Sequence, residues 1–184
     1  MFTFFFHKQP AGVQQMITSE WVMVTCIVVC LSGCTNLKEY DVTFNDRAIY
    51  SPQKLFSDYR IDDKALANCI EQAIEDFEVY SADGLEILNC SSAGINSLIG
   101  LSQFGNLKRL KLSENNIRNL VELTVMTELT DLQVDGNQVV DAIPLASVPK
   151  LKRANLAGNA TLQCGGLAKL PQQIRVTPPE HCIP

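Results

Sequence analysis

This 184-residue sequence contains seven cysteines and two histidines, the residue types most often used as nucleophiles, general bases or metal ligands. The histidines, His7 and His181, lie near opposite ends of the sequence, which argues against a Ser-His-Asp triad or a metal site built from several histidines. A nucleophile motif such as GxSxG is absent from the sequence. We therefore expect no catalytic residues, no metal ligands and no cofactor, and the cysteines become the informative residues.

Cys34 directly follows an apolar run of 13 residues, Trp21–Gly33. A membrane-spanning helix needs about 20 apolar residues, whereas the core of a signal peptide needs roughly 7 to 15. Residues 1–33 are therefore predicted to be a signal peptide. Its end, Leu31-Ser32-Gly33-Cys34, resembles the lipobox of bacterial lipoproteins, in which an aliphatic residue and two small residues precede a lipidated cysteine.

The resemblance to lipoproteins implies that Cys34 becomes the acylated N-terminus of a protein of the bacterial cell envelope. By the sorting rule of that family, Thr35 in place of an aspartate implies the outer membrane of a Gram-negative cell. The segment before the apolar run is long and poor in basic residues for a signal peptide, so Met16 is an alternative start. A short membrane anchor or a buried strand is the alternative interpretation of the run, but neither explains why it ends in LSGC.

Four cysteines follow Cys34 in the sequence: Cys69, Cys90, Cys164 and Cys182. An even number of cysteines in an exported chain favours disulfides, and their spacing contains no CxxC motif typical of zinc sites. Four cysteines allow three pairings.

Charge separates the sequence into two parts and excludes one class of function. The chain has 15 basic and 20 acidic residues, a formal net charge of −5, which argues against a nucleic-acid-binding protein. Residues 35–84 have 5 basic and 11 acidic side chains, whereas residues 85–172 have 8 and 7. This shift predicts a boundary near Gly84.

A 22-residue period runs through residues 85–172, in four units that begin at Leu85, Leu107, Leu129 and Leu151. Positions 1, 4, 6, 11, 14, 17 and 20 of the units are apolar in 27 of 28 cases, with Thr161 as the exception. The pattern resembles the leucine-rich repeat family, specifically the 22-residue bacterial type LxxLxLxxNxIxxLxxLxxLxx of internalin-like surface proteins.

Positions 4 and 6 alternate as in a strand with one buried face, and the apolar residues from position 11 onward recur every three residues, which suits 3₁₀ or extended structure. We therefore expect an α/β fold: a short leucine-rich repeat solenoid with a curved parallel β-sheet, a 3₁₀ or extended convex side and an N-terminal helical cap. The resemblance implies that Asn115, Asn137 and Asn159, at position 9, turn inward and bond the backbone of adjacent turns. Ala93 occupies this position in the first repeat.

The predicted domain plan is a signal peptide (1–33), a lipidated tether (34–39), an N-terminal extension and helical cap (40–84), four repeats (85–172) and a C-terminal cap (173–184). Apolar residues of the segment 62–77 fall on one helical face: Leu66, Cys69, Ile70, Ala73, Ile74 and Phe77. In the extension, alternating residues around Val42 predict a strand that turns at Asn45-Asp46 and returns towards Tyr50. We expect the extension to pack on the cap, with a partner-binding arm as the alternative.

The repeat register then favours one pairing of the cysteines. Cys90 has inward position 6 of the first repeat, next to the cap helix that contains Cys69, and Cys164 has inward position 14 of the last repeat, next to the tail that contains Cys182. A crossed bond between Cys90 and Cys164 would span three repeats, about 14 Å, against a Cα limit near 7 Å. The predicted disulfides are Cys69–Cys90 and Cys164–Cys182.

Positions 3, 5 and 7 of the repeats are expected to form the exposed concave face of the sheet. Its polar candidates for binding a partner are Arg109, Lys111, Asp131, Gln133, Asp135, Arg153 and Asn155. Residues 87, 109, 131 and 153 at position 3 would place opposite charges side by side. The alternative is a solvated face, and the absence of Trp, Tyr and Phe from these positions predicts a weak partner or one that uses the cap.

These observations predict a lipid-anchored envelope protein whose repeat domain is a non-catalytic protein-interaction module. Its partner would be a protein of unidentified kind, its contact with the membrane would be the lipid anchor, and nucleic acid is not expected to bind. The alternative is a structural or stress-related envelope lipoprotein without a dedicated ligand. An enzyme is the least favoured class.

Overall fold

The structure is a computed structural model that describes residues 42–44, 47–50 and 53–183. The chain divides into two compact units, Met1–Pro52 and Gln53–Pro184. In the first unit, β1 (Val42–Phe44) and β2 (Arg47–Tyr50) form the antiparallel hairpin that the alternating residues predicted. The predicted signal peptide, Cys34 and the tether 34–39 lie outside the described residues. Within the described ranges, no helix is sufficiently long and apolar to cross a membrane.

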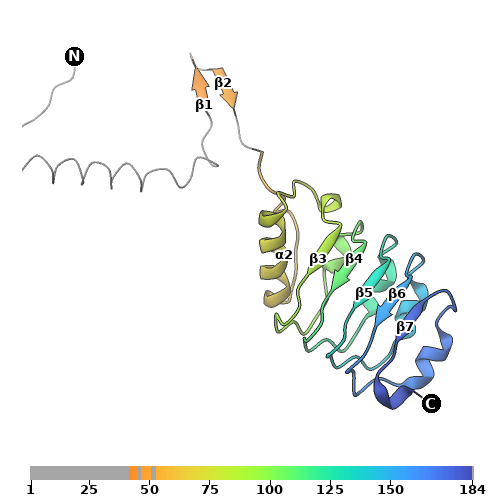
Figure 1. The fold of residues 1–184 in the computed structure, drawn as a ribbon. Helices are drawn as coiled ribbons and strands as arrows, with labels where there is room; N and C mark the ends of the chain where they lie inside the picture. The colour runs from red at the N-terminus through yellow and green to blue at the C-terminus, as the bar shows by residue number, and fades with distance from the viewer. Residues whose placement is uncertain (1–41, 45–46, 51–52, 184) are drawn as a thin grey trace, which may run out of the picture. The chain divides into compact units, whose positions relative to one another are not determined.

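The second unit is built around a parallel sheet in which each turn of the chain contributes one short strand (Figure 1). The strands are β3 (Ile87–Asn89), β4 (Arg109–Lys111), β5 (Asp131–Gln133), β6 (Arg153–Asn155) and β7 (Arg175–Thr177). Neighbouring strands pair residues that are 22 apart, as in Leu88↔Leu110↔Leu132. The predicted leucine-rich repeat architecture and its strand register are therefore confirmed.

The opposite side of the solenoid consists of short 3₁₀ helices, as the three-residue apolar spacing predicted. These helices are Leu101–Gln103, Val121–Val125, Ile143–Ser147 and Cys164–Lys169, and two more, Ala82–Gly84 and Glu180–Cys182, lie near the ends of the repeat domain. Pro144 lies in the first turn of its helix, where a missing N–H costs no intrahelical hydrogen bond.

The inward side chains of the first three repeats are all buried, including Leu110 and Leu112 on either side of exposed Lys111. The fourth repeat departs from the prediction, because Thr161 is exposed and Leu162, one residue later, is buried. The Thr161 hydroxyl donates a hydrogen bond to the carbonyl oxygen of Val139 at 3.0 Å. The apolar register thus shifts by one residue within the fourth repeat.

Three asparagines connect successive turns, as the resemblance implied. The Asn137 amide nitrogen donates to the carbonyl oxygens of Leu112 and Val134, while its amide oxygen accepts from the Ile117 N–H at 3.0 Å. Asn115 and Asn159 repeat this pattern one turn earlier and one turn later. Buried polar atoms of the turns are thereby satisfied.

The N-terminal cap is α2 (Lys64–Asp76), which begins after the N-cap residue Asp63 and buries Leu66, Ile70, Ala73 and Ile74. The prediction that Phe77 continues this buried face is wrong, because its side chain is 64% exposed. The helix ends at Asp76, and the backbone then turns so that Val79 is buried instead.

Residues 53–61 add an aromatic cluster beneath the cap. The rings of Phe56 and Tyr59 both meet Phe104 of the first repeat edge-on, with centroids 6.1 and 5.4 Å away. Burial, together with the nearby carboxylates of Glu71 and Glu75, raises the pKa of the Tyr59 phenol. The cap therefore covers the first repeat with packed side chains from both α2 and the segment before it.

The C-terminal cap differs from the expected tail, because residues 175–177 form the fifth strand, β7, in register with β6. The parallel sheet thus has one strand more than the four predicted repeats, and this strand lies in the predicted C-terminal cap. Disulfides join Cys69 to Cys90 and Cys164 to Cys182, with Cα atoms 5.8 and 5.3 Å apart, and these are the pairs that the repeat register favoured. The inward position predicted for Cys164 is wrong, however, because the residue is exposed.

Candidate functional site

The concave face is defined here as the outward positions 3 and 5 of the five strands. Its members are Ile87 and Asn89, Arg109 and Lys111, Asp131 and Gln133, Arg153 and Asn155, and Arg175 and Thr177. These side chains project to solvent because the alternate residue of each strand points into the core. Six of the seven predicted partner-binding residues therefore lie side by side on one surface.

The seventh predicted residue, Asp135, has a structural role that the sequence did not reveal. Its carboxylate accepts hydrogen bonds from the Ser113 hydroxyl at 2.8 Å and from the Asn155 amide at 3.0 Å. Ser113 is buried, so position 7 is less exposed than predicted. The chain turns inward directly after each strand, and this network fixes the turns of three repeats to one another.

Asp131 lies between two arginines in the row of position 3, since β5 pairs with β4 on one side and β6 on the other. The predicted neighbourhood of opposite charges is therefore confirmed. The carboxylate forms an ion pair with Arg153 and accepts a hydrogen bond from the Thr130 hydroxyl at 2.8 Å. Among residues 53–183, no ion pair joins it to Arg109.

A shallow hollow of about 370 Å³ lies over β3 to β6 on this face. It is lined by Ile87, Leu88, Asn89, Arg109, Leu110, Lys111, Asp131, Gln133 and Arg153. The structure thus gathers five of the predicted residues around one depression and places Asp135 and Asn155 outside it. The hollow combines three cationic side chains with one anionic side chain and a partly exposed Ile87.

Arg175 is a member of the concave face that the sequence reasoning missed. It lies on β7, opposite Arg153, and its side chain is exposed. The sequence pattern could have predicted its place on the concave face, because Arg175 follows Arg153 by one 22-residue period. It was overlooked because Gln173, at position 1 of this incomplete unit, breaks the apolar pattern.

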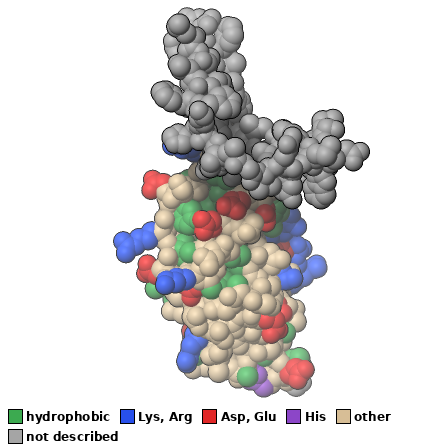
Figure 2. Space-filling view, turned by 90° about the vertical axis from the view of Figure 1, so that its left-hand side faces the viewer, with side chains coloured by type: hydrophobic (Ala, Val, Ile, Leu, Met, Phe, Trp, Pro, Cys, Tyr) green, Lys and Arg blue, Asp and Glu red, His purple; other side chains and the backbone are tan. Residues whose placement is uncertain are grey.

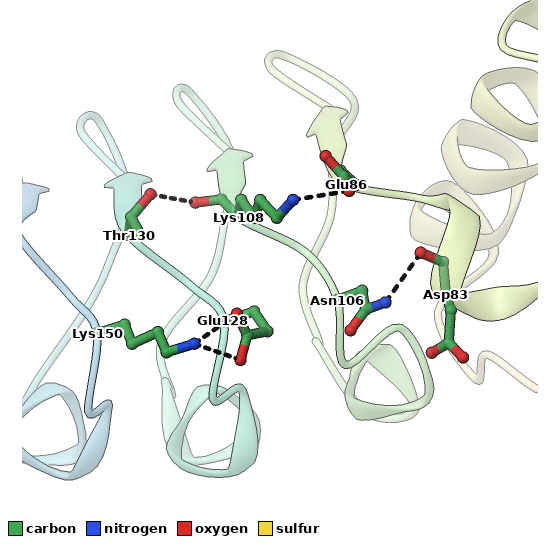
Figure 3. Close-up of polar contacts among 7 residues, drawn as sticks. All are labelled: Asp83, Glu86, Asn106, Lys108, Glu128, Thr130 and Lys150. Carbon is green, nitrogen blue, oxygen red and sulfur yellow. Dashed lines mark hydrogen bonds and ion pairs between the residues drawn. The ribbon is translucent and has the colours of Figure 1, made fainter.

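Polar contacts along the edge where the strands begin fasten each repeat to the next (Figure 3). Lys108 pairs with Glu86, and Lys150 pairs with Glu128, each at 2.7 Å. The Thr130 hydroxyl donates to the carbonyl oxygen of Lys108 at 3.0 Å. These side chains satisfy one another, so this edge is better suited to holding repeats together than to binding a partner.

Charges of both signs are dispersed over the face of the molecule drawn in Figure 2, where Lys and Arg side chains alternate with Asp and Glu side chains. The view shows no continuous basic surface of the kind that neutralises a nucleic-acid backbone. The concave face has four cationic side chains and one anionic side chain, although the chain as a whole has a formal charge of −5.

Cys164, His181 and Cys182 are a cluster of potential metal ligands in the described part of the chain, with donor atoms within 4.8 Å of one another. The two sulfur atoms form a disulfide and therefore offer no thiolate. The His181 ring donates a hydrogen bond from Nε2 to the carbonyl oxygen of Leu162 at 2.9 Å. These contacts fix the C-terminal cap to the last repeat.

Solved structures of bacterial leucine-rich repeat proteins resemble this one. Internalin C2 of Listeria monocytogenes is 23% identical with a TM-score of 0.50, and the match covers 62% of this chain and 57% of that structure. The internalin InlF of the same organism is 21% identical with a TM-score of 0.50, and the match covers 59% of this chain and 34% of that structure. These similarities show a shared leucine-rich repeat fold.

This chain spans about half or less of the length of those internalin structures. No protein-family model matches the sequence, and no curated protein sequence matches it either. The fold is therefore established by the structure and its neighbours, and any function has to be argued from the surface.

Proposed function

We propose that this protein is a lipid-anchored component of the bacterial envelope whose leucine-rich repeat domain is a non-catalytic protein-interaction module. The observation that supports it most is the concave face, a polar surface five strands wide that contains a hollow lined by Arg109, Lys111 and Gln133. Solenoids of this type use such extended concave surfaces for binding. Rigid strands hold the side chains, so that little ordering is required when a partner binds.

The anchor rests on the sequence Leu31-Ser32-Gly33-Cys34. Acylation of Cys34 with more than one chain gives stable membrane association, whereas a single chain gives only marginal binding. Mass spectrometry of the mature protein is expected to find an acylated N-terminal Cys34, and Cys34→Ser is expected to leave an uncleaved precursor without lipid. An unmodified N-terminus at another residue in the wild type would disprove the anchor. Loss of Trp21, which is the only tryptophan, provides an optical check because mature protein would show tyrosine emission alone.

Photo-crosslinking in intact cells tests the interaction module. A crosslinking amino acid at Gln133, which is exposed at the hollow, is expected to capture a defined protein, whereas one at Val125, which is 61% exposed on a 3₁₀ helix, is not. The charge reversal Lys111→Glu should abolish capture from Gln133. Equal capture from both positions, or none from Gln133, would contradict the module and favour a structural lipoprotein without a dedicated ligand.

A further inference from the structure

Asp131 and Asp135, the two anionic residues at positions 3, 5 and 7 of the repeats, already have partners within the protein. Asp131 pairs with Arg153, and Asp135 accepts hydrogen bonds from Ser113 and Asn155. The charge of Asp131 is therefore compensated by Arg153, and the oxygen of Asp135 that faces the sheet already accepts two hydrogen bonds. A partner that approached with cationic groups would have to compete with these contacts.

Three cationic side chains of the same surface have no such compensation. Arg109, Lys111 and Arg175 are exposed, and among residues 53–183 none of their side chains takes part in an ion pair or hydrogen bond. Arg109 and Lys111 project from one strand on the same side, at the hollow, while Arg175 lies three strands away. The concave surface thus has an excess of positive charge on a chain whose formal charge is −5.

We infer that the partner bound at the concave face presents an extended acidic polypeptide segment, an inference that rests on the proposed function. Carboxylates of this segment pair with Arg109 and Lys111 in the hollow and with Arg175 at the far end of the sheet. Arginine suits carboxylates because its planar fork can form two parallel hydrogen bonds. Ile87, which is 40% exposed at the hollow, offers contact to an apolar side chain next to the acidic one.

The strand spacing sets the length of the segment. Arg109 and Arg175 are separated by three strand spacings of about 4.8 Å, roughly 14 Å in total. An extended chain advances about 3.3 Å per residue, so two carboxylates four residues apart span about 13 Å. A segment that crosses the strands and has Asp or Glu at positions i and i+4 therefore fits the two arginines.

A nucleic acid fits this surface less well. Duplex binding depends on neutralising many phosphates, and three free cations on an acidic protein provide few such contacts. A short acidic peptide requires only two or three pairs. Pairs at an exposed surface contribute modestly, which agrees with a weak partner.

Binding of a fluorescein-labelled peptide to the full-length chain in detergent micelles tests the proposal. The probe is an eight-residue peptide with Glu at positions 2 and 6 and one Leu, and its counterpart has Gln at both positions. We expect the Glu peptide to bind at least fivefold more tightly at low ionic strength, with the difference reduced by salt. Equal binding of the two peptides would overturn the proposal.

Matched variants locate the site. The double variant Arg109→Gln/Lys111→Gln is expected to weaken binding of the Glu peptide about five- to tenfold. Lys64→Gln/Lys169→Gln removes the same charge from exposed residues outside the concave face and is expected to change binding less than twofold. If both double variants bind the Glu peptide equally weakly, net charge alone attracts the peptide and the proposal is disproved.

A gain of binding is expected from Asp131→Asn, because this substitution releases Arg153 from its ion pair and removes the negative charge from the hollow. The Glu peptide should bind about threefold more tightly to this variant. No gain would contradict the internal compensation from which the proposal starts. Circular dichroism checks that each variant is folded.

Two further outcomes separate this proposal from the proposed function. Tighter binding of a single-stranded oligonucleotide or of anionic phospholipid vesicles than of the Glu peptide, through Arg109 and Lys111, would overturn the acidic polypeptide. If crosslinking from Gln133 still captures the same protein in Arg109→Gln/Lys111→Gln cells, the interaction module stands and the acidic segment is disproved.

Discussion

The Asp63 carboxylate joins the cap helix to the first repeat by accepting a hydrogen bond from the backbone N–H of Asn96 at 2.9 Å. The Ser97 N–H donates to the same oxygen at 3.1 Å, while the other oxygen caps α2 by accepting from Ala65 and Leu66. One side chain therefore both starts the helix and fixes it to the solenoid. In the first repeat, Ala93 stands in place of the inward asparagine, and α2 packs next to β3.

Substitution of Asp63 is expected to weaken this junction in a pH-dependent way. Burial by itself would raise the pKa of Asp63, but hydrogen bonds from four backbone N–H groups outweigh it and lower the pKa below its ordinary 3.8. Ionised Asp63 thus stabilises the fold above the unfolded pKa, and this stabilisation is lost as the pH falls through the folded pKa. Asp63→Ala should lower the free energy of unfolding by about 1–2 kcal/mol at neutral pH.

Urea unfolding at a series of pH values measures this effect, and the difference between wild type and Asp63→Ala should shrink as the pH falls below about 4. Asp62→Ala is the matched control, because the exposed Asp62 carboxylate has only a 3.9 Å ion pair with exposed Arg60. A difference for Asp63→Ala that persists unchanged to the lowest pH would contradict the lowered pKa.

Three consecutive residues at the end of β4 and directly after it should respond very differently to substitution. Leu110→Ala and Leu112→Ala should each lower the free energy of unfolding by about 2–5 kcal/mol, because both side chains are fully buried and leave cavities. Lys111→Ala should change it by no more than about 0.5 kcal/mol, as exposed positions usually do. Urea unfolding of the three variants provides the measurement. A large loss for Lys111→Ala with little for Leu110→Ala would refute the inward and outward assignment on which the concave face depends.

Removal of one ladder asparagine should be costly despite the small change in volume. Asn137→Ala leaves the buried Ile117 N–H without its partner. The Leu112 and Val134 carbonyl oxygens lose one of two asparagine donors, since Asn115 and Asn159 still donate to them. One unsatisfied buried group costs about 1–3 kcal/mol, so we expect a loss of about that size in urea unfolding. Asn119→Ala, at an exposed residue that bonds only the Val121 N–H, should lose less than 1 kcal/mol. Comparable losses for both asparagines would contradict the ladder.

The two disulfides should differ in how readily they are reduced. Non-reduced peptide mapping is expected to find Cys69 linked to Cys90 and Cys164 linked to Cys182. Because Cys90 is 2% exposed whereas Cys164 is exposed, limiting dithiothreitol should open the C-terminal bond first. Each bond closes a loop of about 20 residues, and its loss should cost on the order of 3 kcal/mol. Earlier reduction of Cys69–Cys90 would show that exposure does not control access.

The strand register, the 3₁₀ side and the pairing of the cysteines could all be predicted from the sequence pattern. Each repeat places the same position in the same environment, so that the burial of Leu110 predicts that of Leu132, 22 residues later. The helical start at Asp63 was equally local, since a side chain caps backbone groups only two and three residues away. Contacts between neighbouring residues, and environments that recur every 22 residues, can both be predicted from the order of residues along the chain.

Features that depend on the residues beside or beyond a repeat became visible only in the folded chain. Phe77 is exposed because α2 ends one residue earlier, and β7 forms because the β6 edge offers unpaired backbone groups. Cys164 is exposed although its place in the repeat predicted an inward side chain. The surplus of free cations was also invisible in the sequence, where Arg109 and Arg153 are equivalent neighbours of Asp131. Which of them pairs is decided by side-chain geometry across strands, and a periodic sequence pattern does not contain that information.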